Sequence, residues 1–511
     1  MAEPVVSPFA ASSLMPLVKY AYLQSELKGE DLLLVAPRVE WPVDGADTMS
    51  TQEILLANER LNVAPQPTVA GGRTRLSGTY LATESDFGLF CVFDGHNGRD
   101  AAAHCRNELL SILMALLPSG PLPADQESQE FRTFCGLVQK ALVVSFMQLQ
   151  HGFAVKGKVA GSTATVVLQC GWLLTVANVG DSYALLDTGS QTMLLTADHR
   201  VASSKTEQER MTALGIRMTN IDSSGHGPAA DPAKGIGPLR IWPGGVMNAR
   251  VIGDLTSGNI LLASPSISQV RVPSTGGRVI VASDGLWDCF EPPRVVKLTR
   301  RCTTAQAADT LINSIIRAQG GLKDDTSLIV FDMLPADREF PHAELIVMAQ
   351  LDTAALLGFV PRGIKERNDS AHMTWQDPKL LAALKDTQEE SALVWQQASK
   401  NASMGLQPVR SFGGSASLVD YFREERTEAR TKRKEGLARP STFPLSSGRP
   451  PLPHQGRPSL TDAHQDPLAS TSTMGNRHQE SLATQGIGRS SSSPATSAHK
   501  LFSITQSHTL T

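Results

Sequence analysis

The sequence has few aromatic residues, no long apolar run and no excess of charge of one sign. Aromatic residues make up 5% of the 511 residues, and 47 Lys and Arg stand against 50 Asp and Glu, a formal net charge of −3. This balance argues against a dedicated nucleic-acid-binding protein, which would carry a strongly basic domain. No run of about 18 apolar residues occurs, so we expect no transmembrane helix. The N-terminal segment has no basic stretch ahead of a long apolar one, so we expect no secretory signal.

Cysteine is scarce as well. The chain has six, and none belongs to a CxxC pair or has the spacing of a zinc site. Several of them lie in apolar, strand-like runs such as LFCVFD and VVLQCGW. We therefore predict buried free thiols in a reducing compartment, the cytoplasm, the nucleus or an organelle stroma. The six residues are Cys91, Cys105, Cys135, Cys170, Cys289 and Cys302.

Composition changes near residue 335. Apolar runs and glycine-rich turns alternate before it, whereas Ser, Thr, Pro, Gln and His dominate after about residue 402. Such a stretch buries too little apolar surface to offset chain entropy, so we predict a disordered tail on which partners could dock. Helical patterns interrupt this C-terminal part at 377–400 and 417–436. The predicted parts are an N-terminal extension (1–19), a catalytic domain (20–335), a partly helical extension (336–401) and the tail (402–511).

Within residues 20–335, β-branched apolar runs are joined by short turns and alternate with helical patterns. The runs 162–170 and 172–179 meet at Gly171, which predicts a hairpin. This order favours antiparallel sheets covered by helices. Residues 39–80 show little pattern apart from 51–61, and we interpret them as a surface insertion. Helices are predicted at 98–117, 130–150, 204–215 and 304–320.

Aspartates stand where apolar strands begin or end. Asp94 ends one run, Asp284 ends another with Asp288 close behind, and Asp324–Asp325 precede a third. Any one such residue is more often a turn former or a helix cap. Carboxylates gathered at one sheet rim raise each other's pKa unless a cation neutralises them, and their oxygens suit hard ions such as Mg²⁺ or Mn²⁺.

The sequence around Asp94 adds a second feature. Asp94-Gly95-His96 precedes Asn97-Gly98, and this turn leads directly into a predicted helix. The glycine lets a backbone carbonyl approach a metal, and the histidine stands beside it as a candidate general acid.

Seven segments resemble, in order, the motifs of the protein phosphatase 2C family of metal-dependent Ser/Thr phosphatases. The resemblance covers roughly residues 20–335, and the phrase GPLRIWPGG looks most like a plant and algal branch. An acidic pair that the family carries near its N-terminus is assigned to Glu30 and Asp31. The segments are VFDGHNG (92–98), GSTATVVL (161–168), VANVGDSYALL (176–186), LTADHR (195–200), ARVIGD (249–254), VASDGLWDCF (281–290) and KDDTSLIVFD (323–332).

The resemblance implies an α+β fold, a sandwich of two antiparallel β-sheets flanked by helices, and a site with two Mg²⁺ or Mn²⁺ ions. A hydroxide that bridges the ions attacks phosphorus in line, and His96 protonates the leaving seryl or threonyl oxygen. Asp94 bridges the ions and the Gly95 carbonyl binds one of them. The remaining ligands are Asp284 and Asp324 for the first ion, and Glu30 and Asp31 for the second.

The sequence departs from the family pattern at three positions. Glu26 stands where the family carries the arginine that grips the substrate phosphate, so Lys28 is the nearest candidate cation. Lys158 replaces one usual ligand of a third metal, whereas Asp288, the other, is present, which makes a third site doubtful. Asp325 replaces the usual Asn and adds one acid near the ions.

Two functions therefore compete. The first is an active phosphatase acting as a monomer on phosphoserine and phosphothreonine in phosphoproteins, without nucleic acid or membrane partners. The alternative is a pseudophosphatase, which would use the same fold as a binding or regulatory module. Manganese-dependent hydrolysis of an aryl phosphate distinguishes the two.

Overall fold

The computed structural model describes residues 15–42, 73–336, 345–360, 375, 377–404 and 415–437. Most of the predicted N-terminal extension, the middle of the predicted insertion and most of the predicted tail lie outside these ranges. Of the described helices, none is long and apolar enough to cross a membrane.

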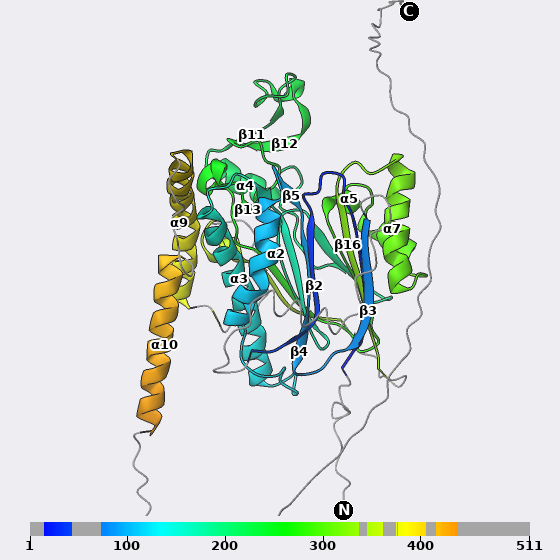
Figure 1. The fold of residues 1–511 in the computed structure, drawn as a ribbon, viewed down its shortest axis with the longest axis vertical. Helices are drawn as coiled ribbons and strands as arrows, with labels where there is room; N and C mark the ends of the chain where they lie inside the picture. The colour runs from blue at the N-terminus through cyan, green and yellow to red at the C-terminus, as the bar shows by residue number, and fades with distance from the viewer. Residues whose placement is uncertain are drawn as a thin grey trace, which may run out of the picture. The chain divides into compact units, whose positions relative to one another are not determined.

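Two six-stranded antiparallel sheets lie face to face, which confirms the predicted fold class (Figure 1). The first sheet has the order β10-β9-β15-β16-β1-β3. Its strands are β10 (Thr192–Leu194), β9 (Tyr183–Asp187), β15 (Gly277–Ala282), β16 (Thr326–Leu334), β1 (Leu17–Ser25) and β3 (Arg73–Leu81). The second sheet has the order β17-β14-β8-β7-β4-β2. Its strands are β17 (Ile346–Asp352), β14 (Ser266–Arg271), β8 (Leu173–Val179), β7 (Ala164–Cys170), β4 (Asp86–Phe93) and β2 (Leu32–Glu40).

The space between the sheets is filled by apolar side chains. Phe90 of β4 stacks on Phe331 of β16 with ring centroids 4.3 Å apart, so the two sheets meet in direct contact. Central strands are buried on both faces, which is why they read as continuous apolar runs in the sequence. The predicted hairpin is present, because β7 and β8 pair in register across Gly171, whose φ of +53° suits glycine.

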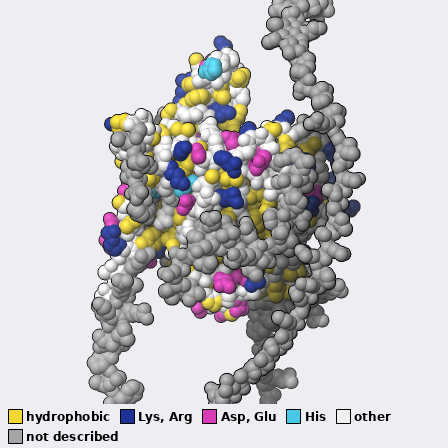
Figure 2. Space-filling model, in the orientation of Figure 1, with side chains coloured by type: hydrophobic (Ala, Val, Ile, Leu, Met, Phe, Trp, Pro, Cys, Tyr) yellow, Lys and Arg dark blue, Asp and Glu magenta, His cyan; other side chains and the backbone are white. Residues whose placement is uncertain are grey.

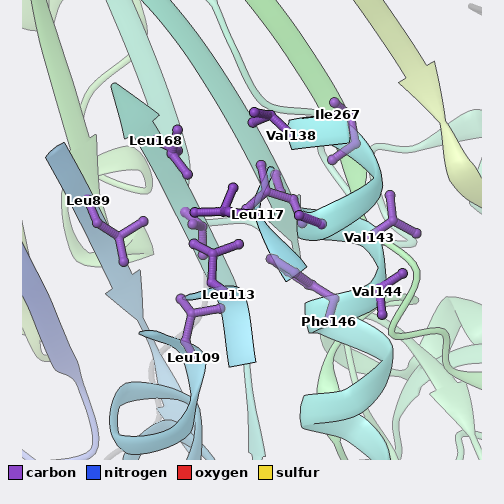
Figure 3. Packing of buried hydrophobic residues seen from close by; sticks show 14 of the residues in the cluster. Leu89, Leu109, Leu113, Leu117, Val138, Val143, Val144, Phe146, Leu168 and Ile267 are labelled. Carbon is purple, nitrogen blue, oxygen red and sulfur yellow. The ribbon is translucent and has the colours of Figure 1, made fainter. Parts of the chain in front are cut away.

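Helices cover the outer face of each sheet. α2 (Asp100–Leu116) and α3 (Gln129–Ala154) pack against the second sheet, where Leu109 and Phe146 point toward Leu168 and Ile267 (Figure 3). α5 (Asp284–Trp287), α6 (Pro292–Thr299) and α7 (Thr304–Gln319) share an apolar cluster with the first sheet. The fold is therefore a four-layer sandwich.

Two strands depart from the prediction. β3 occupies residues 73–81 and pairs with β1, so the surface insertion is shorter at its C-terminal end than we predicted. β17 pairs with β14 and forms an edge of the second sheet, beyond the predicted domain boundary at 335. α8 (Thr353–Leu356) follows it, α9 (Pro378–Ser403) packs against α3, and α10 (Ala416–Leu437) packs against α9. The boundary itself stays a prediction.

A small projection lies at one end of the sandwich. It contains α4 (Lys205–Ala213), the hairpin strands β11 (Arg217–Ile221) and β12 (Ile236–Trp242), and the short helix η1 (Pro232–Lys234), and the hairpin stands at the top of Figure 1. Beside it, β13 (Ile252–Gly253), β6 (Gly161–Ser162) and β5 (Gly95–His96) form a three-stranded sheet. The short helix η2 (Leu255–Ile260) follows β13. Figure 2 shows side chains of both charges interspersed over the face in view.

Candidate active site

The predicted acids come together where strands of both sheets begin or end. Asp94 follows β4, Asp284 follows β15, and Asp324 precedes β16. Burial raises the pKa of Asp94 well above its usual range, and the charges of Asp31, Asp181 and Asp324 raise it further. The pKa of Asp284 is raised in the same way by burial and then by Asp94, Asp181 and Asp288. These mutual effects show that acids far apart in the sequence share one site.

Asp31 is the most deeply buried of the predicted ligands, with 2% of its surface exposed. Burial is the main cause that raises its pKa to about 7, and the charges of Asp325 and Asp284 add to it. Its Oδ2 is buried and has no hydrogen-bond partner within the described residues. A buried carboxylate oxygen without a partner is costly unless a cation binds it.

Asp325 holds the turn that carries the acidic pair. Its Oδ1 accepts hydrogen bonds from the backbone N–H groups of Leu27 (2.5 Å) and Lys28 (2.6 Å), and its Oδ2 from those of Glu30 (2.7 Å) and Asp31 (3.2 Å). Burial opposes its charge, but the four bonds lower its pKa. Asp325 adds an acid near Asp31, as we predicted, but it also holds the turn in place. It connects the start of β16 to the turn between β1 and β2.

Glu30 and Gly95 lie against each other at this turn. Oε1 of Glu30 accepts a hydrogen bond of 2.6 Å from the backbone N–H of Gly98. A Cβ on Gly95 would stand 2.5 Å from the carbonyl oxygen of Glu30, so only glycine fits between them. The turn after β4 and the turn before β2 are thereby held together.

His96 forms a close pair with Asp254, at 2.5 Å between Nε2 and Oδ2. Burial acts against the charged imidazole, but the bond to Asp254 and the charges of Asp254, Asp181 and Glu30 raise its pKa overall. A Cβ on Gly161 would stand 2.3 Å from Nε2 of His96, so glycine makes room for the pair. The pair with Asp254 thus favours the protonated imidazole of His96.

Arg200 lies among the acids, and sequence reasoning missed it. Its guanidinium bonds to Asp181 through Nε, to Asp284 through Nη2 (2.9 Å) and to Asp288 through Nη1 (2.5 Å). Asp181 also accepts a hydrogen bond of 2.8 Å from the amide of Asn248. These acids raise the pKa of Arg200 despite its partial burial. The cation partly neutralises one side of the acidic cluster.

Lys28 lies on the other side of the cluster. Its Nζ is 2.7 Å from Oδ2 of Asp324, and this hydrogen bond is the main cause that raises its pKa. Lys158 is 3.6 Å from Asp100 on α2. Glu26 is exposed, with its Oε1 3.5 Å from the amide nitrogen of Gln24.

Sequence reasoning also missed Asp181 and Asp254. Asp181 follows the apolar strand β8 as Asp94 follows β4, so the same strand-end rule identifies it. Asp254 ends the motif ARVIGD, but no local pattern links it to His96, 158 residues away. Its φ of +49° is unusual for a residue other than glycine, and such strain concentrates at functional sites.

The chemistry of the site suits a hard divalent ion. The described residues offer no group of three or more His, Cys, Asp or Glu side chains arranged to hold a metal ion. Arg200 pairs with Asp284, and Lys28 pairs with Asp324. The buried Oδ2 of Asp31, which has no partner among the described residues, and the raised pKa values of Asp94 and Asp284 fit a divalent cation bound among these carboxylates. Carboxylate oxygens in this number fit Mg²⁺ or Mn²⁺.

Comparison with known proteins identifies the family of this chain. The family model described as Protein phosphatase 2C matches residues 72–320 of this chain. Probable protein phosphatase 2C 12 of Arabidopsis thaliana is 31% identical over 311 residues, which cover 61% of this chain and 68% of that protein. The chain belongs to the protein phosphatase 2C family, whose members are metal-dependent, generally with magnesium or manganese.

Other relatives match over shorter stretches. Probable protein phosphatase 2C 3 of Oryza sativa subsp. japonica is 38% identical over 257 residues, 50% of either chain. The chain thus spans about half to two thirds of the length of the curated relatives it matches. A crystal structure of serine-threonine phosphatase 2C from Toxoplasma gondii aligns with 63% of this chain and 97% of that chain, at 17% identity and a TM-score of 0.44.

Proposed function

We propose that this chain is a metal-dependent protein phosphatase that hydrolyses phosphoserine and phosphothreonine in protein substrates. The observation that supports it most is the gathering of Asp31, Asp94 and Asp284 at one rim, where burial and mutual repulsion raise their pKa values. Such a cluster is unstable as free carboxylates and becomes favourable around divalent cations.

The residues divide between binding ions and moving a proton. Asp94, Asp284, Asp324, Glu30, Asp31 and the carbonyl of Gly95 would hold two Mg²⁺ or Mn²⁺ ions. When bound, the ions would supply an activated water and neutralise the phosphoryl oxygens. Asp325 positions Glu30 and Asp31 through the backbone N–H groups of their turn.

His96 would donate a proton to the leaving oxygen. The buried carboxylate of Asp254 raises the pKa of the imidazole, which favours its charged form, and it fixes the ring through Nε2. An alkoxide leaving group needs this proton, whereas a nitrophenolate does not, because its pKa is low. Nδ1 of the same ring is the proton donor in this assignment, since Nε2 is held by Asp254.

One observation favours the alternative, a pseudophosphatase. Lys28 and Arg200 already pair with proposed or neighbouring metal ligands, and Glu26 replaces the family arginine that grips phosphate. In that case the fold would bind a phosphoprotein without hydrolysing it.

A leaving-group comparison tests the proposal. The full-length protein and His96→Ala are assayed on p-nitrophenyl phosphate and on a phosphoserine peptide, each with Mn²⁺ and with a chelator. We expect Mn²⁺-dependent hydrolysis of both substrates by the unmodified protein. His96→Ala should lose about 10²- to 10⁴-fold on the peptide and far less on the aryl ester. Equal losses would remove the general-acid role, and no hydrolysis of either substrate by the unmodified protein would favour the pseudophosphatase.

We also propose that the protein acts as a monomer in the cytoplasm or the nucleus. All six cysteines are unpaired, and four of them are buried, as suits a reducing compartment. Light scattering of the purified chain and imaging of a fluorescent fusion in the native cell test these two points.

A further inference from the structure

A groove lies between β10, the edge strand of the first sheet, and α6. Its cavity volume is about 740 Å³. Leu185 and Val296, both buried, contribute to its apolar lining together with Leu194 and Pro292. Leu194 is 39% exposed, so part of this apolar lining is open to solvent.

The rim of the groove is basic. Lys297, Arg300 and Arg301 line it at the end of α6, and all three are exposed. Arg300 is held by Asp187 through two hydrogen bonds of 2.8 and 2.9 Å. Across the described ranges, neither Lys297 nor Arg301 forms an ion pair. Two exposed cations beside an apolar surface are complementary to a partner that carries both carboxylates and apolar side chains.

The edge strand offers backbone groups as well. In the part of the chain that the structure describes, β10 pairs with β9 alone. An extended peptide can add a strand to such an edge, gaining main-chain hydrogen bonds while alternate side chains enter the groove. This geometry favours an extended segment over a helix.

Both walls of the groove continue directly into the proposed active site. Leu194 of β10 is six residues before Arg200, and Pro292 of α6 is four residues after Asp288. A chain spans at most about 3.6 Å per residue, so the groove lies within roughly 20 Å of these two site residues. One protein substrate can therefore reach both places.

We propose that this groove, between β10 and α6, binds an extended segment of the phosphoprotein substrate that is rich in acidic and apolar residues. The segment lies apart from the phosphorylated residue and raises the affinity of the enzyme for selected substrates. The inference rests on the proposed phosphatase function, because it names the substrate feature that the enzyme recognises outside its active site.

The test uses the full-length protein and two phosphoserine peptides. One carries a flexible linker followed by an alternating Glu-Leu arm, and the other carries the same linker followed by a Lys-Leu arm. The variant is the double substitution Lys297→Glu with Arg301→Glu. Arg317→Glu, an exposed cation of α7 outside the groove, is the matched control.

We expect the unmodified protein and the control to have a lower KM for the Glu-Leu peptide than for the Lys-Leu peptide. The double variant should raise KM for the Glu-Leu peptide about tenfold and leave its kcat, and the hydrolysis of p-nitrophenyl phosphate, unchanged. The difference should shrink in 0.5 M salt, where charge attraction is screened. Equal KM values for the two arms, or an unchanged KM in the double variant, would overturn the proposal.

A binding measurement separates this inference from the phosphatase proposal. Fluorescence anisotropy of the Glu-Leu peptide without phosphate reports on the groove even if the chain hydrolyses nothing. Binding that the double variant loses supports the groove independently of catalysis. If light scattering instead shows a dimer that the double variant dissociates, the groove is an interface between copies of this chain, and the proposal fails.

Discussion

Arg200 and Asp284 are joined by a hydrogen bond of 2.9 Å between Nη2 and Oδ2. One of the two carries a fixed positive charge and the other is a proposed metal ligand. The same guanidinium bonds Asp181 and Asp288, so it holds three carboxylates on one side of the site. Arg200 therefore competes with a divalent cation for these oxygens.

Removing this competitor should strengthen metal binding. In Arg200→Ala we expect the apparent Kd for Mn²⁺ to fall about tenfold or the number of bound ions to rise, since Asp181, Asp284 and Asp288 are left without their cation. Arg200→Lys keeps the positive charge, so its apparent Kd for Mn²⁺ should lie between those of the unmodified protein and of Arg200→Ala. Isothermal titration calorimetry measures both quantities without any turnover. Unchanged Mn²⁺ binding in Arg200→Ala would mean that these carboxylates take no part in holding metal.

Asp325 should be essential to the acidic pair although it binds no ion. Asp325→Ala removes the acceptor of four backbone N–H groups, and we expect it to lower the free energy of unfolding by at least about 2 kcal/mol and to weaken Mn²⁺ binding. Asp325→Asn keeps one acceptor oxygen and should have a smaller effect. Urea unfolding and calorimetry measure the two quantities.

A matched control exists on the surface. Asp309 pairs with Arg75 at 2.9 Å, and both side chains are over one third exposed. Asp309→Ala should lower the free energy of unfolding by less than about 1 kcal/mol. Equal costs for Asp325→Ala and Asp309→Ala would contradict the role of Asp325 in the turn.

A buried charge network connects β17 to the rest of the domain. Arg250 is almost fully buried and bonds Glu207 of α4 at 2.7 Å and Asp352 of β17 at 2.9 Å. Asp352→Ala leaves this guanidinium with one carboxylate in place of two, so we expect a loss of about 3 kcal/mol in the free energy of unfolding. Glu127→Ala, which removes a largely exposed partner of Arg271, is the control and should change stability little. A small effect of Asp352→Ala would show that the pair with Arg250 contributes little to holding β17 in the fold.

Two buried histidines predict loss of stability in acid. Burial, together with the charges of Arg250 and Lys156 respectively, lowers the pKa of His199 and of His104 to about 3. The folded state thus holds both rings neutral, while the unfolded state protonates them near pH 6.5. Their contribution is complete above about pH 6.5 and falls as the pH drops toward 3, by up to about 1.4 kcal/mol per pH unit for each ring.

The acids whose pKa is raised in the folded state make the fold more stable as the pH falls, which opposes the effect of the histidines. The stability of one variant relative to the unmodified protein therefore isolates the effect of one histidine. His104 contacts the carbonyl of Leu149 at 2.9 Å through Nε2, and a Gln amide can replace this donor. Between pH 6.5 and 4.5, the free energy of unfolding should fall less steeply with pH in His104→Gln than in the unmodified protein. The difference between the two slopes should correspond to about one bound proton. Identical slopes would show that His104 is not held neutral in the fold.

Much of the fold and some of the site residues could be predicted from local patterns in the sequence. Asp94 and Asp284 follow strands that are buried on both faces, so an apolar run that ends in an acid identified them. β3 was missed because it alternates exposed and half-buried residues at a sheet edge, and its sequence RTRLSGTYL has few apolar side chains. Arg200 and Asp254 were missed because their partners are 84 and 158 residues away and only the fold brings them together.

The central claim is that Asp94 lies at a metal-dependent phosphatase centre. The most direct measurement is phosphate release from a phosphoserine peptide by the unmodified protein and by Asp94→Asn, each at saturating Mn²⁺ and with a chelator, with circular dichroism to confirm that the variant is folded. We predict Mn²⁺-dependent release by the unmodified protein and a loss of at least about 10³-fold in the folded variant, because the ion-binding charge is gone. Near-normal turnover by Asp94→Asn at saturating Mn²⁺ would contradict the account.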